Sequence, residues 1–165
     1  MEKTNLINKI EKHTKEKETK KVLIEEINKY LIFSILEKKY AVLAKEVKEV
    51  IFDSDIFFLP FVPSYVRGLI SRHGEPYTVI DLNIVFNNKT LDANTYFVLK
   101  DDSDQLAVLI SDVIRFANIK KSDVLQISSH EEHDNYFSGA IANESNNDDQ
   151  CMIINLQLIK EKLSK

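Results

Sequence analysis

The second half of this chain repeats the pattern of the first half, and this repeat constrains the fold more than any other feature of the sequence. Four pieces recur in the same order: residues 30–39 and 96–105, 41–50 and 107–116, 68–70 and 139–141, and 79–84 and 153–158. The second pair, AVLAKEVKEV and AVLISDVIRF, aligns without gaps. Two copies at so long a period do not form a solenoid. They predict two units of similar topology, joined near residues 87–94.

The repeated pieces have the composition of β-strands. Residues 30–36, YLIFSIL, are rich in aromatic and β-branched residues, and similar short runs follow at regular intervals. Pro60 and Pro63 impose an extended connection that cannot donate to a central ladder. This spacing is typical of an all-β barrel or sandwich, with about five strands in each unit. A short C-terminal helix is predicted for residues 156–165, with Leu156, Ile159 and Leu163 on one face.

The first 29 residues follow a different pattern. Residues 11–18, EKHTKEKE, carry charges of both signs three and four apart, which favours a helix with a solvated middle. We therefore divide the chain into a helical extension, residues 1–29, and a two-barrel part, residues 30–165. The first barrel is expected at about residues 30–90 and the second at about residues 91–165. The extension either docks on the body through residues 22–27 or binds a partner.

Composition excludes several classes of protein. The chain is 44% hydrophobic, has one cysteine and carries a net charge of −4. No apolar run approaches the roughly 18 residues of a spanning helix, and no signal peptide is recognisable, so we expect a cytoplasmic protein that does not insert into membranes. The net negative charge argues against a nucleic-acid partner, because phosphate binding needs a concentrated basic face.

The chain offers few residues for catalysis or metal binding. His130 and His133 stand three apart in a polar connection, which misses the spacing of the metalloprotease motif. Cys151 begins an apolar strand and is expected to be a core residue rather than a nucleophile. Asp81 and Asn155 occupy matching positions after buried strands, where they are expected to cap short helices. We predict a protein that is not an enzyme and has no cofactor or metal site.

Residues 61–82, FVPSYVRGLISRHGEPYTVIDL, resemble the signature of the CheW family. In that family a proline and a hydrophobic residue precede an Arg/Lys-Gly-Val-Ile turn, followed by Asn-x-Arg-Gly and by a strand that ends in Val-Ile-Asp-Leu. The resemblance continues through residues 106–113 and 137–141 and covers about residues 30–163.

The resemblance implies two SH3-like five-stranded β-barrels packed together, a fold that agrees with the repeat. It also implies an adaptor that couples the cytoplasmic tips of chemoreceptors to the regulatory domain of the histidine kinase CheA. Such a protein would be a monomer in solution that can take part in an array. The family pattern carries a set of partner-binding positions onto this chain: Val47, Glu49 and Val50 on a strand facing the kinase or receptor, Arg67 and Gly68 at the turn beside it, and Val113 and Ile114 near a receptor helix between the barrels.

One position departs from the family pattern. Where the family has Asn-x-Arg-Gly, this chain has Ser71, Arg72, His73 and Gly74, so a histidine replaces the arginine that the family ties to coupling. Imidazole and guanidinium are not interchangeable, since guanidinium keeps a permanent charge and five donors. Strand alternation places Arg72 on the opposite face, which predicts that Arg72 does not substitute for the missing arginine.

Two other functions stay open at this point. A small ligand-binding or catalytic barrel would use the cleft between the barrels, with Arg72 and His73 holding an anionic group. Alternatively, the chain is a CheW-like spacer that joins the array without activating the kinase, because of His73.

Overall fold

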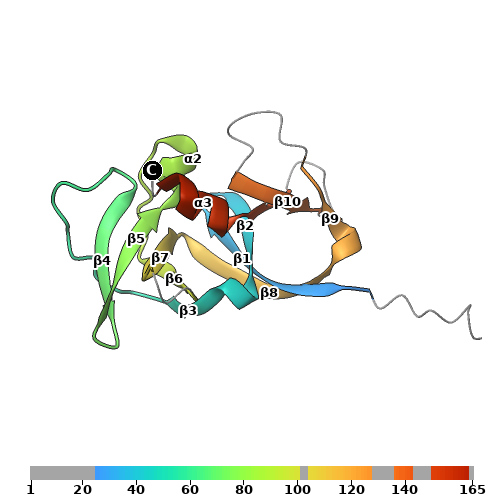
Figure 1. The fold of residues 1–165 in the computed structure, drawn as a ribbon, viewed down its shortest axis with the longest axis horizontal. Helices are drawn as coiled ribbons and strands as arrows, with labels where there is room; N and C mark the ends of the chain where they lie inside the picture. Colours follow the sequence, from blue (N-terminus) through green and yellow to red (C-terminus); the bar gives the residue numbers. More distant parts are fainter. Residues whose placement is uncertain (1–24, 101–103, 128–135, 143–149, 164–165) are drawn as a thin grey trace, which may run out of the picture.

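The computed structural model describes residues 25–100, 104–127, 136–142 and 150–163 (Figure 1). The β-strands are β1 Ile27–Ile35, β2 Lys38–Leu43, β3 Val47–Ile51, β4 Val66–Arg72, β5 Glu75–Asp81, β6 Thr95–Leu99, β7 Leu106–Ile110, β8 Asp112–Lys120, β9 Val124–Leu125, β10 Phe137–Ile141 and β11 Cys151–Ile154. The helices are η1 Ala44–Glu46, α2 Leu82–Asn87, η2 Lys121–Asp123 and α3 Leu156–Leu163. In this part of the chain no helix is long and apolar enough to cross a bilayer.

The N-terminal boundary differs from the prediction. Strand β1 begins at Ile27, so residues 27–29 belong to a strand and not to a helical extension. The reason is tertiary, since Ile27, Asn28 and Lys29 pair with Lys120, Ile119 and Asn118 of β8. Residues 1–24, which carry most of the predicted extension, lie outside the described residues.

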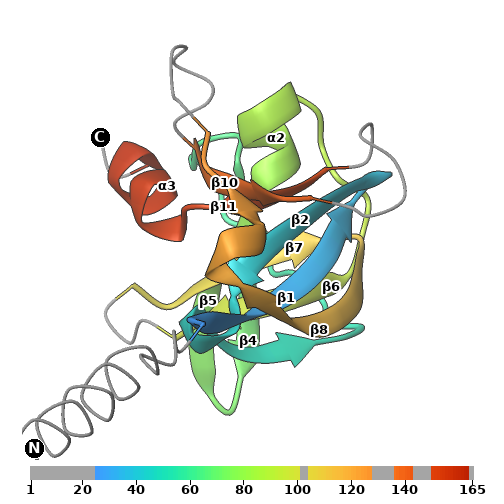
Figure 2. The same ribbon diagram turned by 90° about the vertical axis from the view of Figure 1, so that its right-hand side faces the viewer.

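The strands form two curved sheets. The six-stranded sheet has the order β8-β1-β2-β11-β10-β9, and the five-stranded sheet has the order β3-β6-β7-β5-β4. Figure 2 views the molecule from the end that carries the six-stranded sheet. The all-β prediction is confirmed, but the two units are not a pair of closed five-stranded barrels. Among the described residues, no backbone pairing joins the two edge strands of either sheet. The SH3-like character of each unit stays a prediction.

The two sheets do not correspond to the two halves of the chain. Strands β1 and β2 come from the first copy of the repeat but lie in the six-stranded sheet with β8–β11 of the second copy. Strands β6 and β7 of the second copy lie in turn in the five-stranded sheet with β3–β5. The boundary predicted near residue 90 therefore does not separate two barrels, because the copies have exchanged their first hairpins.

The repeat nevertheless extends to fine details of strand pairing. Each copy has a bulge in its third strand, between Val47 and Glu49 and between Val113 and Arg115. A second pair of bulges lies between Val66 and Gly68 in β4 and between Phe137 and Gly139 in β10. In each sheet a parallel pairing, β5 with β7 or β11 with β2, attaches the exchanged hairpin. The two copies are thus equivalent in topology.

The exchanged hairpins place the main core between the sheets. In β1, Leu31 and Phe33 face this core, whereas Tyr30 and Ile32 face a smaller core on the other side of the same sheet. Cys151 lies in the smaller core, as predicted for a small core residue. Because both faces of β1 are buried, its apolar run is continuous rather than alternating. Helix α3 covers the gap between the sheets with Leu156, Ile159 and Leu163, the face predicted from the sequence.

Candidate functional site

Strand β3 and the β4–β5 turn form one continuous surface, which we call the hairpin surface. It consists of predicted partner-binding residues and one neighbour: Val47, Glu49, Val50, Arg72, His73 and Gly74. Strands β3 and β4 are opposite edges of the five-stranded sheet. The sheet curls so far that Arg72 Nε donates to Glu49 Oε2 across the gap, at 2.9 Å. Lys48 Nζ similarly donates to Tyr77 Oη at 3.0 Å. Side chains of β3 therefore reach β4 and β5 across the gap that the backbone leaves open.

Arg72 lies at the end of β4, where its guanidinium binds Glu49 of β3. Alternation along β4 holds up to this residue, since Ile70 is buried, Ser71 is exposed and Arg72 is half-buried. Strand β4 ends there, and His73 has a φ of 52° in the turn that follows, so whether Arg72 substitutes for the family's arginine stays a prediction. Outside an extended strand, successive side chains no longer point to opposite faces. His73 and Gly74 are exposed at the tip of this turn.

The valines of the hairpin surface are only half-exposed. Val47 and Val50 pack against the main core, and so does Val113 of β8. Ile114, at the β8 bulge, is more accessible, with 45% of its surface exposed. Ile114 lines an open hollow of about 690 Å³ on the six-stranded sheet, together with Arg115, Leu125 and other residues. That a receptor helix docks near Val113 and Ile114 stays a prediction.

Arg67 is bound within the structure. Its guanidinium donates to Asp81 Oδ2 at 2.9 Å and to the carbonyl of Leu91 at 3.0 Å. Asp81 is fully buried; its other oxygen accepts from the backbone N–H groups of Asn83 and Ile84 and caps α2. Asp81 Oδ2 also accepts from the N–H of Leu91. The predicted cap is confirmed, and Arg67 joins the turn, the helix and the connection that follows it.

Gly68 is buried beneath the connection between β3 and β4. An isolated bridge joins Leu69 to Phe57, with N–H···O distances of 2.7 and 2.9 Å. A Cβ on Gly68 would lie 2.3 Å from the Phe57 carbonyl oxygen. Gly68 also has a φ of +138°, which L side chains rarely adopt. The residue therefore offers no side chain to a partner but holds the connection against the sheet.

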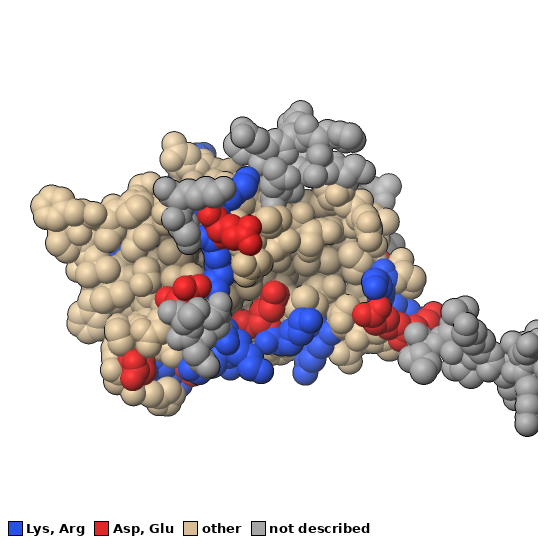
Figure 3. Space-filling model, viewed as in Figure 1, with Lys and Arg blue, Asp and Glu red and all other residues tan. Residues whose placement is uncertain are grey.

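A groove lies between the two sheets, and we call it the lysine groove. It has a volume of about 570 Å³ and is lined by Lys45, Glu46, Leu99, Lys100, Leu156, Gln157 and Lys160. The residues come from η1, from the end of β6 and from α3. Leu99 and Leu156 are buried and form an apolar floor. Figure 3 shows Lys and Arg side chains on this face below α3, with acidic side chains among them.

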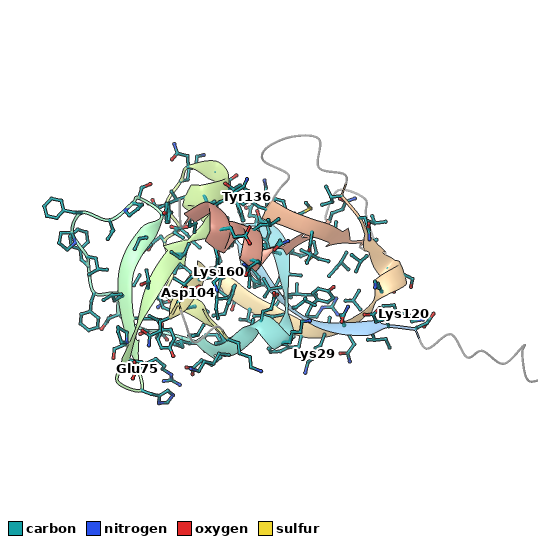
Figure 4. All side chains as sticks on the ribbon, in the orientation of Figure 1. Lys29, Glu75, Asp104, Lys120, Tyr136 and Lys160 are labelled. Atoms are coloured by element: carbon teal, nitrogen blue, oxygen red, sulfur yellow. The ribbon has the colours of Figure 1, made fainter. Side chains whose placement is uncertain are left out.

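The charges around the lysine groove are partly paired. Lys160 Nζ lies 2.7 Å from Asp104 Oδ2, and Figure 4 shows the two side chains facing each other. Burial raises the pKa of Glu46 above its usual value of 4.5, while a hydrogen bond with the backbone of Leu43 and the charge of Lys45 act in the opposite direction. Sequence reasoning missed this groove, because its residues become contiguous only after the hairpins have exchanged.

Sequence reasoning also left a group of exposed aromatic side chains without a role. Phe57, Phe58 and Phe61 lie in the connection between β3 and β4, and Phe61 is fully exposed. Phe61 has a φ of 61°, a region that bulky residues rarely occupy. Three phenylalanines next to two prolines in a connection were the available signal for such a patch.

The described residues contain no cluster of three or more His, Cys, Asp and Glu side chains that could hold a metal ion. His130 and His133 lie outside this part of the chain. Arg72 and His73, the pair considered for an anion-binding cleft, line neither the lysine groove nor the hollow beside Ile114. What these surfaces present is backbone edge, apolar floor and charge, which are the features of protein recognition.

Comparisons with known proteins agree with this architecture. No curated protein matches the chain. Among solved structures, the chain is similar to the scaffolding protein TtCheW from Thermoanaerobacter tengcongensis, with a TM-score of 0.68 and 21% sequence identity over 79% of this chain and 90% of that chain. At this identity the likeness shows the fold. The family model of the CheW-like domain matches residues 29–162. That match spans both sheets and nearly all of the described residues, and it shows that this chain belongs to the CheW family.

Proposed function

We propose that this chain is a cytoplasmic chemotaxis adaptor, without catalytic activity, that couples chemoreceptor tips to the regulatory domain of the histidine kinase CheA. Its membership of the CheW family supports this role. The observation that carries the proposal is the lysine groove, where a receptor tip would bind. Residues of η1, β6 and α3 line it, and Val47 of the hairpin surface pairs with Leu99 in its floor. An adaptor needs two neighbouring surfaces of this kind on one body.

The kinase would bind the hairpin surface. Strand β3 is an edge strand with half-exposed valines and a bridged Glu49, so it offers both backbone groups and side chains to a partner. Arg67 and Gly68 would act indirectly, by holding the β3–β4 connection in place. Val113 and Ile114 on β8 would belong to a second contact on the other sheet. The adaptor would act as a monomer that enters an array through these contacts.

Direct titration tests the proposal. The purified chain is titrated against the regulatory domain of CheA and, separately, against a receptor-tip hairpin. Interfaces of this kind predict dissociation constants of roughly micromolar order. Glu49→Lys places a second cation beside Arg72 and is expected to weaken kinase binding by at least about tenfold. Glu37→Lys, in the exposed β1–β2 turn, is the matched control and should leave binding unchanged. No binding to either partner up to roughly millimolar concentration would contradict the proposal.

In a related role, the chain would bind the same partners without activating the kinase. His73 stands at the exposed turn in place of the family's arginine, and a spacer that binds without activating CheA would follow from that replacement. The test is kinase activation by the His73→Arg variant in reconstituted receptor–kinase complexes. Higher activation by the variant favours the spacer role, and equal activation shows that Arg72, bridged to Glu49, suffices.

A further inference from the structure

We infer that the lysine groove selects an acidic helical segment, in which Asp or Glu side chains flank an apolar residue. This inference rests on the proposed function for its site and adds the chemistry of the partner. A segment of this type would place the apolar residue on Leu99 and Leu156 and its carboxylates beside the rim lysines. The chain as a whole is acidic, with a net charge of −4, so this basic rim is a local feature.

The internal repeat allows the groove lysines to be compared with the residues at the matching positions of the other copy. The alignment of the copies matches Lys45 with Ser111, Lys100 with Ser34 and Lys160 with Phe86. All three lysines therefore have uncharged counterparts at equivalent positions of the same topology. Phe86 packs its ring against Tyr40 and Phe137, at centroid distances of 5.7 and 5.2 Å. Because the other copy holds uncharged residues at all three positions, we expect that folding does not require the lysines of the groove.

The lining also favours a helix over an extended peptide. Strand β6 lies inside its sheet, between β3 and β7, so its backbone groups are already paired. The rest of the lining comes from the short helices η1 and α3. An extended peptide would find no free strand edge here, whereas a helix recognises its site through side chains alone. Helix α3 forms one wall, against which a second helix can pack.

The charge balance of the groove leaves room for an acidic partner. Lys160 is paired with Asp104, and Glu46 lies half-buried beside Lys45. The groove thus has three lysines and two carboxylates. A basic partner would be repelled by the excess of positive charge, whereas an acidic partner would be attracted. Rim contacts of this kind contribute modestly to affinity and strongly to selectivity, and they weaken as salt increases.

The test uses the full-length chain and a receptor-tip hairpin, in its natural form and in a form with the Glu residues of its tip changed to Gln. The double variant Lys45→Ser, Lys100→Ser copies the residues of the other repeat. It is expected to bind the natural hairpin roughly three- to tenfold more weakly at about 0.05 M salt, and the difference should shrink at about 0.5 M salt. The neutral hairpin should bind both proteins equally.

The matched control is the double variant Lys38→Ser, Lys89→Ser, which removes two exposed lysines outside the groove and should bind like the wild type. Binding to the CheA regulatory domain should be the same for both double variants, which excludes a general folding defect. If the wild type binds the hairpin and neither the groove lysines nor salt matters, the inference is wrong while the proposed function stands. If the wild type binds no hairpin at all, the proposed receptor site itself fails.

Discussion

Two glycines of one hairpin are required for different structural reasons. Gly68 is buried, and a Cβ there would overlap the Phe57 carbonyl oxygen at 2.3 Å. Gly74 has a φ of +83°, but no atom lies within 4 Å of the position that a Cβ would take. Gly68→Ala is therefore expected to lower the free energy of unfolding by about 3 kcal/mol or more, because it adds a clash to the strain. Gly74→Ala should cost only about 1 kcal/mol, for strain alone. Urea unfolding of both variants measures the difference, and equal losses would contradict it.

Glu46 provides a prediction about pH. Burial raises its pKa in the folded state above 4.5, so the folded protein holds the proton more tightly than the unfolded chain does. Ionisation of Glu46 therefore costs stability, and this cost is absent at low pH and complete once the pH exceeds the raised pKa. Glu46→Gln should be more stable than the wild type at neutral pH, and the advantage should vanish below about pH 4. Thermal unfolding across this range is the measurement, with Glu37→Gln as a control for the loss of one exposed charge.

Arg72 and His73 show where residue-level prediction stops. Strand alternation compares the faces of Arg72 and His73 as if the backbone were extended through both residues, whereas His73 has a φ of 52° and Arg72 pairs with Glu49. The left-handed conformation of His73 depends on the geometry of the turn, and this geometry cannot be predicted from the residue types at positions 72 and 73 alone. By contrast, Asp81 and Asn155 were predicted correctly as caps, because capping depends only on local sequence.

Among the secondary-structure elements, the two capped helices are a natural pair for comparison. Asn155 Oδ1 accepts from Leu158 N at 3.1 Å, while Asp81 caps α2 and also receives Arg67 and Leu91 N–H on its second oxygen. Asp81→Asn keeps the oxygen that caps α2 but replaces the second oxygen with an NH₂ group, which would face two donors, the guanidinium of Arg67 and the N–H of Leu91. It is expected to lower the free energy of unfolding by about 3 kcal/mol.

The converse change, Asn155→Asp, tests whether this loss comes from the cap or from the ion pair. Both residue types cap helices well, so the change should stay within about 0.5 kcal/mol. Chemical denaturation of the two variants under one buffer gives both values. A large loss for Asn155→Asp would attribute the cost to the cap, and no loss for Asp81→Asn would show that the ion pair with Arg67 does not stabilise this region.

Most elements could be predicted from the sequence, because strands, the connection with Pro60 and Pro63, and helix α3 follow from local patterns. The start of β1 was misplaced by three residues, since only pairing with β8 extends the strand to Ile27. The lysine groove could not be predicted, because Lys45, Lys100 and Lys160 are far apart in sequence and meet only through tertiary structure. The proposed hairpin surface was assembled from the family resemblance rather than from physical pattern.

For the molecule as a whole, the exchange of hairpins could not be read from the repeat. Two copies that pair internally and two copies that exchange β1–β2 for β6–β7 have the same strands in the same order. The repeat therefore determined the strand content of each copy but not the partner of its first hairpin. The path of the chain through the short η1 turn, which leads from one sheet to the other, distinguishes the two arrangements.

The exchange predicts how fragments of the chain behave. Residues 25–90 lack β6 and β7, and residues 91–165 lack β1 and β2, so each fragment would leave the centre of a sheet incomplete. Neither fragment alone should show a cooperative unfolding transition, and an equimolar mixture should recover one. Circular dichroism during thermal unfolding, with the intact chain as reference, measures this. A cooperative transition in either isolated fragment, at a concentration where that fragment is monomeric, would contradict the exchanged arrangement.

A chain that held a single copy could complete its sheets only by trading hairpins with a second molecule, and the result would be a dimer with a true two-fold axis. Because of this symmetry, the two clefts of such a dimer would have to be identical. Covalent fusion removes that requirement, so that Phe86 packs its ring against Tyr40 in one copy while Lys160, at the matching position of the other copy, lines an open and charged groove. In this molecule, asymmetry is the property that duplication within one polypeptide makes possible.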